Sequence, residues 1–293
     1  MVIPEKNIPP MSNDLYDSPP PHPKKRFGQH FLTDRNVIRK IVAVARLTPD
    51  DCVVEIGPGR GALTEGLLAT GARVIAIELD RELAPLLKEK LPSGNLEVIE
   101  ADALKVSFPA ISGRLGKRFK VVSNLPYNIS GHIVAKFINE RAAISLMVLM
   151  FQKEVARRLV ARPGTGEYGL LSVFSQLYAD LKVEFDLSRN LFFPKPKVDS
   201  SVVSFRFLDA PRVEIGDEAF FSSVVKSSFT QRRKTLLNSL KHLGMEKEKL
   251  LKALERRGID PRRRGETLTL EEFSGLSLEL YRLRAAGVEI IAS

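Results

Sequence analysis

The chain has 293 residues, 44% of them hydrophobic and 27% charged, a composition typical of a globular protein with one sizeable core and room for a smaller second domain. No apolar run approaches the roughly 18 residues of a membrane span, and the proline-rich N-terminus lacks the apolar region of a secretory signal, so we expect a cytoplasmic protein with no membrane partner. The single cysteine, Cys52, excludes an internal disulfide, and 45 basic against 35 acidic residues give a net charge of +10.

Residues 1–23 contain seven of the 18 prolines and no periodic apolar pattern, which predicts a disordered tail. A first domain is expected over residues 24–209. It opens with a helix whose apolar residues recur at helical spacing from Ile38 to Ala45, and Thr33 or Asp34 can cap that helix.

Short apolar runs then alternate with helical segments, the pattern of a parallel sheet with right-handed crossovers. The expected strands are Cys52 to Ile56, Arg73 to Ile77, Leu96 to Ala101, a run that ends at Asn124, and Ile144 to Met150. The expected helices run from Ala62 to near Gly71, from Asp80 or Ala84, from Gly131 to Glu140, from Lys153 to Ala161 and from Gly169 to Ala179. Two extended runs with no helix between them, Val183 to Leu187 and Ser201 to Leu208, predict an antiparallel pair at one sheet edge. The fold class is therefore α/β, with a mostly parallel, Rossmann-like sheet.

A smaller, all-helical domain is expected over residues 210–293. Its predicted helices are Asp217 to Leu243, Glu246 to Arg257 and Thr269 to Arg284, the last with a capping box between Thr269 and Glu272. The stretch from Lys226 to Arg264 holds 13 Lys or Arg against 4 acidic residues. Solvated helix faces explain single cations, but blocks of like charge such as residues 232–234 and 262–264 repel one another and favour a nucleic-acid partner.

Polar residues and glycines lie at the carboxyl ends of the expected strands, where open α/β sheets bind ligands. Gly57, Gly59 and Gly61 allow a tight turn and close approach to a ligand after the first strand. Glu78 suits ribose hydroxyls, unless it pairs with a neighbouring arginine, and Asp102 suits an adenine amino group, unless it only caps the next turn. These features fit either a nicotinamide cofactor or S-adenosylmethionine.

The tetrapeptide Asn124-Leu125-Pro126-Tyr127 follows the fourth strand. It offers an amide, a ring that restricts Leu125 and an aromatic face, which could hold a planar heterocycle bearing an amino group. A strand cap and a core tyrosine are the simpler interpretation of those residues. Because no proton donor for hydride transfer accompanies them, the pattern favours methyl transfer.

Together with Gln29-His30-Phe31-Leu32, the glycine turn and Phe193-Pro194-Lys195-Pro196, this tetrapeptide resembles the ribosomal RNA adenine dimethyltransferases, with most similarity to their bacterial small-subunit (16S) branch. The resemblance runs from Phe27 to the late 270s and includes Phe229 to Leu236 of the second domain. It implies a class I methyltransferase sheet and S-adenosylmethionine as cofactor. The implied reaction is dimethylation of N6 on two adjacent adenosines, in a hairpin near the 3′ end of 16S rRNA in the assembling small subunit.

The resemblance also assigns roles to residues. The implied cofactor residues are His30, where the family usually has Asn, with Leu32, Gly57, Gly59, Glu78, Asp102 and Asn124. The implied catalytic set is Asn124, Leu125, Pro126, Tyr127 and Phe193, and the implied RNA-binding residues are Arg232, Arg233 and Lys234. We expect a monomer that needs no metal. Two alternatives stay open: a large-subunit methyltransferase of the antibiotic-resistance type and a non-catalytic ribosome assembly factor.

Overall fold

The computed structural model describes residues 29–285, so the expected tail of residues 1–23 lies outside the described part. The chain divides into two compact units. The first takes the described residues up to Ala156 together with Asp180–Phe207, and the second takes Arg157–Ala179 and the residues from Leu208 onward. Residues 157–179 thus group with the helical unit, whereas the sequence placed them before a boundary at residue 210.

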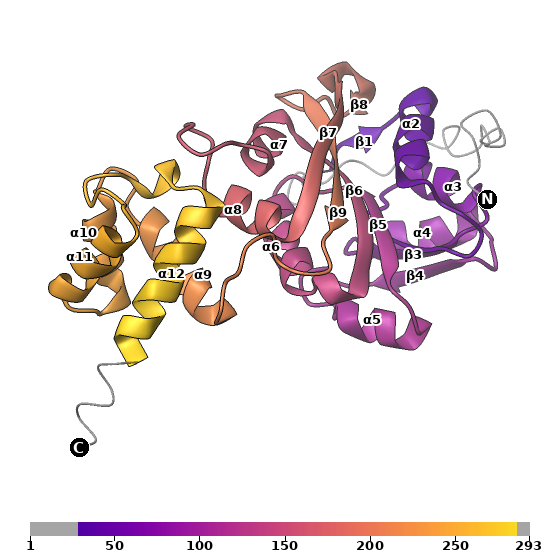
Figure 1. The fold of residues 1–293 in the computed structure, drawn as a ribbon. Coiled ribbons are helices and arrows are strands. Elements are labelled where there is room, and N and C mark those ends of the chain that lie inside the picture. Colours follow the sequence, from indigo (N-terminus) through magenta and orange to yellow (C-terminus); the bar gives the residue numbers. More distant parts are fainter. Residues whose placement is uncertain (1–28, 286–293) are drawn as a thin grey trace. The chain divides into compact units, whose positions relative to one another are not determined.

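A seven-stranded sheet forms the centre of the first unit (Figure 1). In spatial order its strands are β4 (Leu96–Glu100), β3 (Arg73–Glu78), β2 (Cys52–Ile56), β5 (Phe119–Asn124), β6 (Ile144–Gln152), β9 (Ser200–Phe207) and β7 (Ala179–Leu187). The pairs among β4, β3, β2, β5 and β6 are parallel, and β9 joins β6 antiparallel. The predicted α/β class and the antiparallel strands at one edge are confirmed.

The sheet is buried on both faces, which explains why its strands are continuous apolar runs rather than alternating ones. On one face Val53 and Val122 join a core cluster that includes Ile38 and Ile41 of α2 (Arg35–Ala45). Side chains alternate along a strand, so Val54 points to the opposite face, and it too is fully buried.

The crossover helices connect the parallel strands of the sheet. They are α3 (Ala62–Leu68), α4 (Leu83–Lys90), α5 (Phe108–Leu115) and α6 (Ser130–Asn139), and α7 (Lys153–Leu159) follows the last parallel strand. Asp34, one of the two predicted caps, caps α2: its side chain accepts hydrogen bonds from the backbone N–H groups of Asn36 and Val37. The helix α5 was not predicted, although Ser107 caps it through the Ala110 amide.

A two-stranded antiparallel ribbon also escaped the sequence analysis. The strands β1 (Phe31–Leu32) and β8 (Phe192–Phe193) pair Phe31 with Phe193, although these residues lie far apart in the chain. The ribbon brings the Gln29 to Leu32 segment and the Phe193 loop to the same place.

The second unit contains α8 (Leu170–Tyr178), α9 (Glu218–Phe229), α10 (Leu236–Leu240), α11 (Lys247–Arg256) and α12 (Leu270–Ala285), drawn in orange and yellow in Figure 1 apart from α8. Phe221 and Phe273 are fully buried in its core. The capping box is confirmed: Thr269 N–H donates to Glu272 Oε2 at 2.9 Å, and Glu272 N–H donates to Thr269 Oγ1 at 3.2 Å. The single helix predicted over residues 217–243 is wrong, because residues 230–235 form a turn between α9 and α10.

Candidate active site

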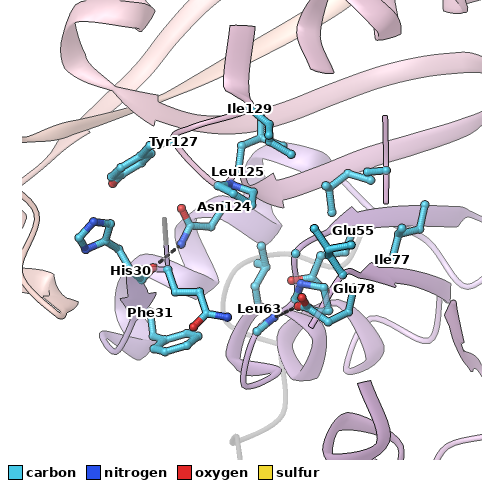
Figure 2. Close-up of a pocket in the computed structure, with 18 of the residues that line it drawn as sticks. His30, Phe31, Glu55, Leu63, Ile77, Glu78, Asn124, Leu125, Tyr127 and Ile129 are labelled. Atoms are coloured by element: carbon cyan, nitrogen blue, oxygen red, sulfur yellow. Dashed lines mark hydrogen bonds between the residues drawn. The ribbon is translucent and has the colours of Figure 1, made fainter. Parts of the chain in front are cut away.

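A pocket opens at the carboxyl ends of the parallel strands in the first unit (Figure 2). The residues of the predicted site that line it are His30, Leu32, Gly57, Gly59, Glu78, Asp102, Asn124, Leu125, Pro126 and Tyr127. They come from five separate segments of the sequence, which the fold brings together at one edge of the sheet. Phe193, the remaining first-unit residue of the predicted set, is not among the lining residues.

The glycine turn after β2 needs its glycines. Gly57 and Gly59 have φ of 65° and 59°, a region that side-chain-bearing residues rarely adopt. A Cβ on Gly57 would lie 3.0 Å from Pro126, and one on Gly59 would lie 2.8 Å from the Phe31 ring. The turn therefore approaches both the tetrapeptide and the β1 segment too closely for any other residue.

Glu78, at the end of β3, is only 6% exposed, and its carboxylate holds two backbone amides. Its Oε2 accepts the Gly59 N–H at 3.0 Å and its Oε1 accepts the Asp80 N–H at 2.9 Å. Burial raises the pKa of Glu78, and these two hydrogen bonds oppose the rise. The alternative of an arginine partner is not seen, since Arg73 pairs with Glu97 and Arg81 with Glu100.

Glu55 lies beneath the glycine turn and is 2% exposed. Its Oε2 accepts a hydrogen bond from the Thr64 hydroxyl at 2.6 Å, which ties β2 to α3. Burial raises the pKa of Glu55 from 4.5 to about 8, the Thr64 bond opposes this, and the nearby Glu78 carboxylate adds to it. The carboxyl of Glu55 is therefore largely protonated at neutral pH.

Asp102 follows β4 and does what the simpler interpretation expected: its Oδ1 caps the next turn by accepting the Leu104 N–H at 2.9 Å. It also lines the pocket, so capping and ligand contact are compatible. Beside it the sequence analysis missed an apolar wall that includes Leu79 and Ala103. Leu79 is 49% exposed, and its position directly after the acidic strand end was the available signal.

The tetrapeptide after β5 is held from the β1 side. Asn124 Nδ2 donates to the main-chain oxygen of His30 at 3.0 Å (Figure 2). The Tyr127 ring stacks on the His30 ring with centroids 5.3 Å apart, and the Tyr127 hydroxyl lies 2.8 Å from Ser200 Oγ. His30 Nδ1 lies 2.6 Å from the Pro194 oxygen. The imidazole that replaces the family's usual Asn thus contacts Tyr127 and the Phe193 loop.

Phe193 lies in β8, and the strand pairing sets it beside Phe31, which lines the pocket. Its side chain is 54% exposed, whereas the neighbouring Phe192 is buried at 4%. An aromatic side chain so exposed next to a pocket is available to a ligand, and Phe193 is therefore not a core residue.

The two basic runs of the second unit differ from each other. Arg232, Arg233 and Lys234 are all exposed in the 230–235 turn, and Arg232 also donates from Nη2 to the Gly166 oxygen at 2.6 Å. In the second run each arginine has an acidic neighbour, since Arg262 pairs with Asp260 at 3.1 Å. The other two pairs are Arg263 with Glu272 and Arg264 with Glu266. These pairs give the second run acidic partners within the protein, which weakens the charge argument there, and contact of residues 262–264 with RNA stays a prediction.

Within residues 29–285, no three His, Cys, Asp or Glu side chains lie close enough together to hold a metal ion. None of the helices in this part of the chain is both long and apolar enough to cross a membrane.

A Rossmann-like sheet with a glycine turn, acidic strand ends and a tetrapeptide of this kind defines an α/β enzyme that binds a nucleotide-like cofactor. The family model for ribosomal RNA adenine dimethylase matches residues 22–281. The chain belongs to that family.

Individual relatives support membership of the same family. The chain is 48% identical to the ribosomal RNA small subunit methyltransferase A of Moorella thermoacetica, over 88% of this chain and 92% of that one. It is 46% identical to the protein of the same name from Geobacter metallireducens, over 89% and 96%. Among solved structures, a dimethyladenosine transferase from Plasmodium falciparum has a TM-score of 0.74 at 29% identity, over 87% and 98%. The 23S rRNA methyltransferase ErmE has a TM-score of 0.65 at 30% identity, over 86% and 99%.

Proposed function

We propose that this chain transfers methyl groups from S-adenosylmethionine to N6 of adenosines in the RNA of the small ribosomal subunit, forming N6,N6-dimethyladenosine. The observation that carries the proposal is the polar contact that fixes Asn124 at the pocket, within a chain whose curated relatives are named small-subunit rRNA methyltransferases. The finer target is two adjacent adenosines in a hairpin near the 3′ end of 16S rRNA, in the assembling subunit and so in the cytoplasm. We propose that a monomer does this without a metal.

The pocket residues fit an adenosine-bearing cofactor. Glu78 and Asp102 place carboxylates for the ribose hydroxyls and the adenine amino group, and Leu79 offers a half-exposed apolar surface for the base. Gly57 and Gly59 line the pocket without side chains, so a ligand can approach the backbone of the turn closely. When bound, S-adenosylmethionine supplies a methyl group on a sulfonium sulfur, an electrophile that is already activated.

The residues of the pocket would prepare adenine N6 to act as the nucleophile. The lone pair of adenine N6 is delocalised into the ring, so the amine must be held with that lone pair localised and aimed. The Asn124 Oδ1 and the main-chain oxygen of Leu125 would accept the two N6 hydrogens and hold the nitrogen pyramidal. As the N6–methyl bond forms and the sulfur–methyl bond breaks to leave a neutral thioether, the nitrogen would become cationic and would lose a proton to water or to one of these carbonyls, so no strong general base is needed.

An adenine inside folded RNA must leave its stack to enter such a pocket. Tyr127 would cover one face of the flipped base, and Phe193 would cover the other. Stacking is worth roughly 1 to 3 kcal/mol per base, which offsets much of the cost of unstacking.

The RNA around the target adenosines would be held by phosphate contacts in the second unit. Arg233 and Lys234 are exposed in the 230–235 turn and support this role. Arg232, although part of the same run, uses one guanidinium nitrogen to bind the main chain of Gly166, so its role in RNA binding is the least supported of the three.

One experiment tests the substrate. Labelled S-adenosylmethionine is offered in parallel to undermethylated small subunits, large subunits and free 16S rRNA. Label in adenosines of the small subunit is expected. The similarity to ErmE makes a large-subunit target the second candidate, and label mainly in large subunits would establish it. No transfer to any of the three, despite RNA binding, would favour the assembly-factor alternative.

A further inference from the structure

The charges that line the pocket are unbalanced. Glu55, Glu78 and Asp102 contribute three carboxyl groups. Arg60, in the glycine turn, is the one Lys or Arg among the described residues that line it. The three carboxyl groups each accept an identified hydrogen bond, so the single cation is the charged group of this pocket whose partner is still to be identified.

Arg60 has an aromatic neighbour but no anionic one. Its guanidinium carbon lies 4.4 Å from the centroid of the Phe31 ring, a cation–π contact. Its Nε and Nη2 are shielded from solvent, and within residues 29–285 neither nitrogen has a hydrogen-bond acceptor. The ring face attracts the charge but does not satisfy N–H groups in the guanidinium plane. Leaving buried donors of a charged group unpaired is costly, so an acceptor is missing from this arrangement.

The pocket that Arg60 lines indicates what that acceptor is. Its partner Phe31 and the Glu78 carboxylate both flank Gly59, so the cation and the carboxylates meet at the same glycine turn. The carboxylates suit the ribose hydroxyls and the adenine amino group, which are neutral. S-adenosylmethionine has one anionic group, the α-carboxylate at the end opposite to adenine, and this is the group that a cation in its pocket can bind.

We propose that Arg60 binds the α-carboxylate of the cofactor's amino-acid end and so makes the pocket specific for an adenosyl compound that carries a carboxylate. The inference rests on the proposed function, since it presumes that cofactor. The cation–π contact with Phe31 already restricts the Arg60 side chain, which limits the rotamer freedom that Arg60 must give up on binding. No covalent step is involved, and Arg60 is a binding residue rather than one that acts on N6.

Calorimetry with two ligands tests the assignment without any turnover. S-adenosylhomocysteine carries the carboxylate, and 5′-(3-aminopropyl)thioadenosine is the same molecule with the carboxylate replaced by hydrogen. For Arg60→Met, which keeps an unbranched stem that can pack on Phe31 but removes the charge, affinity for S-adenosylhomocysteine should fall at least about tenfold. Affinity for the decarboxylated compound should stay within about twofold of the unsubstituted protein. Arg60→Lys should lie between the two, because it keeps the charge but loses the planar fork.

The possible results distinguish a carboxylate-binding Arg60 from one with another role. Equal losses for both ligands would overturn the inference and make Arg60 a structural residue of the turn. No loss for either would also overturn it, and so would a loss confined to RNA binding, which would assign the guanidinium to a phosphate. Failure of the unsubstituted protein to bind either compound would overturn the proposed cofactor itself and this inference with it. Thermal unfolding without ligand checks that Arg60→Met folds, and if it does not, Arg60→Lys carries the same comparison.

Discussion

Asn124 Nδ2 donates to the main-chain oxygen of His30 at 3.0 Å, so the orientation of the Asn124 amide is set by the backbone of the β1 segment. With the nitrogen engaged there, the oxygen is the end that can face a substrate amine. A side chain oriented in this way before the reaction needs no reorganisation during it, which is the condition for effective transition-state stabilisation.

The first prediction separates chemistry from binding. Asn124→Ala should leave the cofactor and RNA bound, since neither Glu78 nor the basic turn is altered, while methyl transfer falls roughly 100-fold or more. A singly methylated nitrogen must present its remaining hydrogen to one of the same acceptors, so both additions should slow. Single-turnover assays on unmethylated and monomethylated substrate measure this, and near-normal rates for both would show that Asn124 is only a strand cap.

The second prediction uses two adjacent phenylalanines of β8 whose environments differ. Phe193→Ala removes a half-exposed ring, so the free energy of unfolding should change little, while RNA capture weakens by roughly 1 to 3 kcal/mol. Phe192→Ala, the matched control, removes a buried ring and should lower the free energy of unfolding by roughly 3 to 5 kcal/mol. Urea unfolding and RNA titration of both variants decide the matter. If Phe193→Ala destabilises as much as Phe192→Ala, Phe193 has a structural role.

The positions of the strand-end residues could be predicted from the sequence because a parallel sheet brings its carboxyl ends together. Glu78, Asp102 and Asn124 each end or follow an apolar run, and all three line the pocket. What those side chains bond to could not be predicted, since the partners are set by folding at long range. The Gly59 amide on Glu78 and the His30 oxygen on Asn124 are examples.

The fold, like the site, could be predicted from the sequence only in part. The five parallel strands were predicted within a few residues because burial on both faces leaves long apolar runs. The β1–β8 ribbon was missed because each strand is two residues long and its partner is distant in the chain. The break between α9 and α10 was missed for a similar reason, since the Leu236 amide at the start of α10 donates to the Arg263 oxygen. No local pattern encodes that contact.

The third prediction divides the basic run by contact. Arg233→Ala combined with Lys234→Ala should weaken RNA binding and lower the salt slope of log K by about 2, because roughly one counterion is released per phosphate contact. Arg232→Ala should lower that slope less, because one nitrogen of this exposed side chain already binds the Gly166 oxygen. It should also speed hydrogen exchange or proteolysis in the segment 162–168. A slope that Arg232→Ala lowers as much as Arg233→Ala alone would place Arg232 on the RNA.

The last prediction concerns pH and the buried carboxyl of Glu55. Its pKa is about 8 in the folded protein against an ordinary 4.5, so between these values the folded state keeps a proton that the unfolded state has lost. The contribution of Glu55 to stability is therefore fully present below pH 4.5 and is lost as the pH rises toward 8, by at most about 1.4 kcal/mol per pH unit.

Glu55→Gln is the matched test, because it keeps the shape and an oxygen that can accept from Thr64 but cannot ionise. The free energy of unfolding of the unsubstituted protein, relative to that of Glu55→Gln, should fall steadily from pH 5 to pH 8. Urea unfolding of both proteins at several pH values in this window gives the difference directly, and comparing the two removes the titration of every other group. Parallel curves would mean that Glu55 ionises in the folded protein as readily as in the unfolded chain, with its charge stabilised by Thr64 or by water beneath the glycine turn.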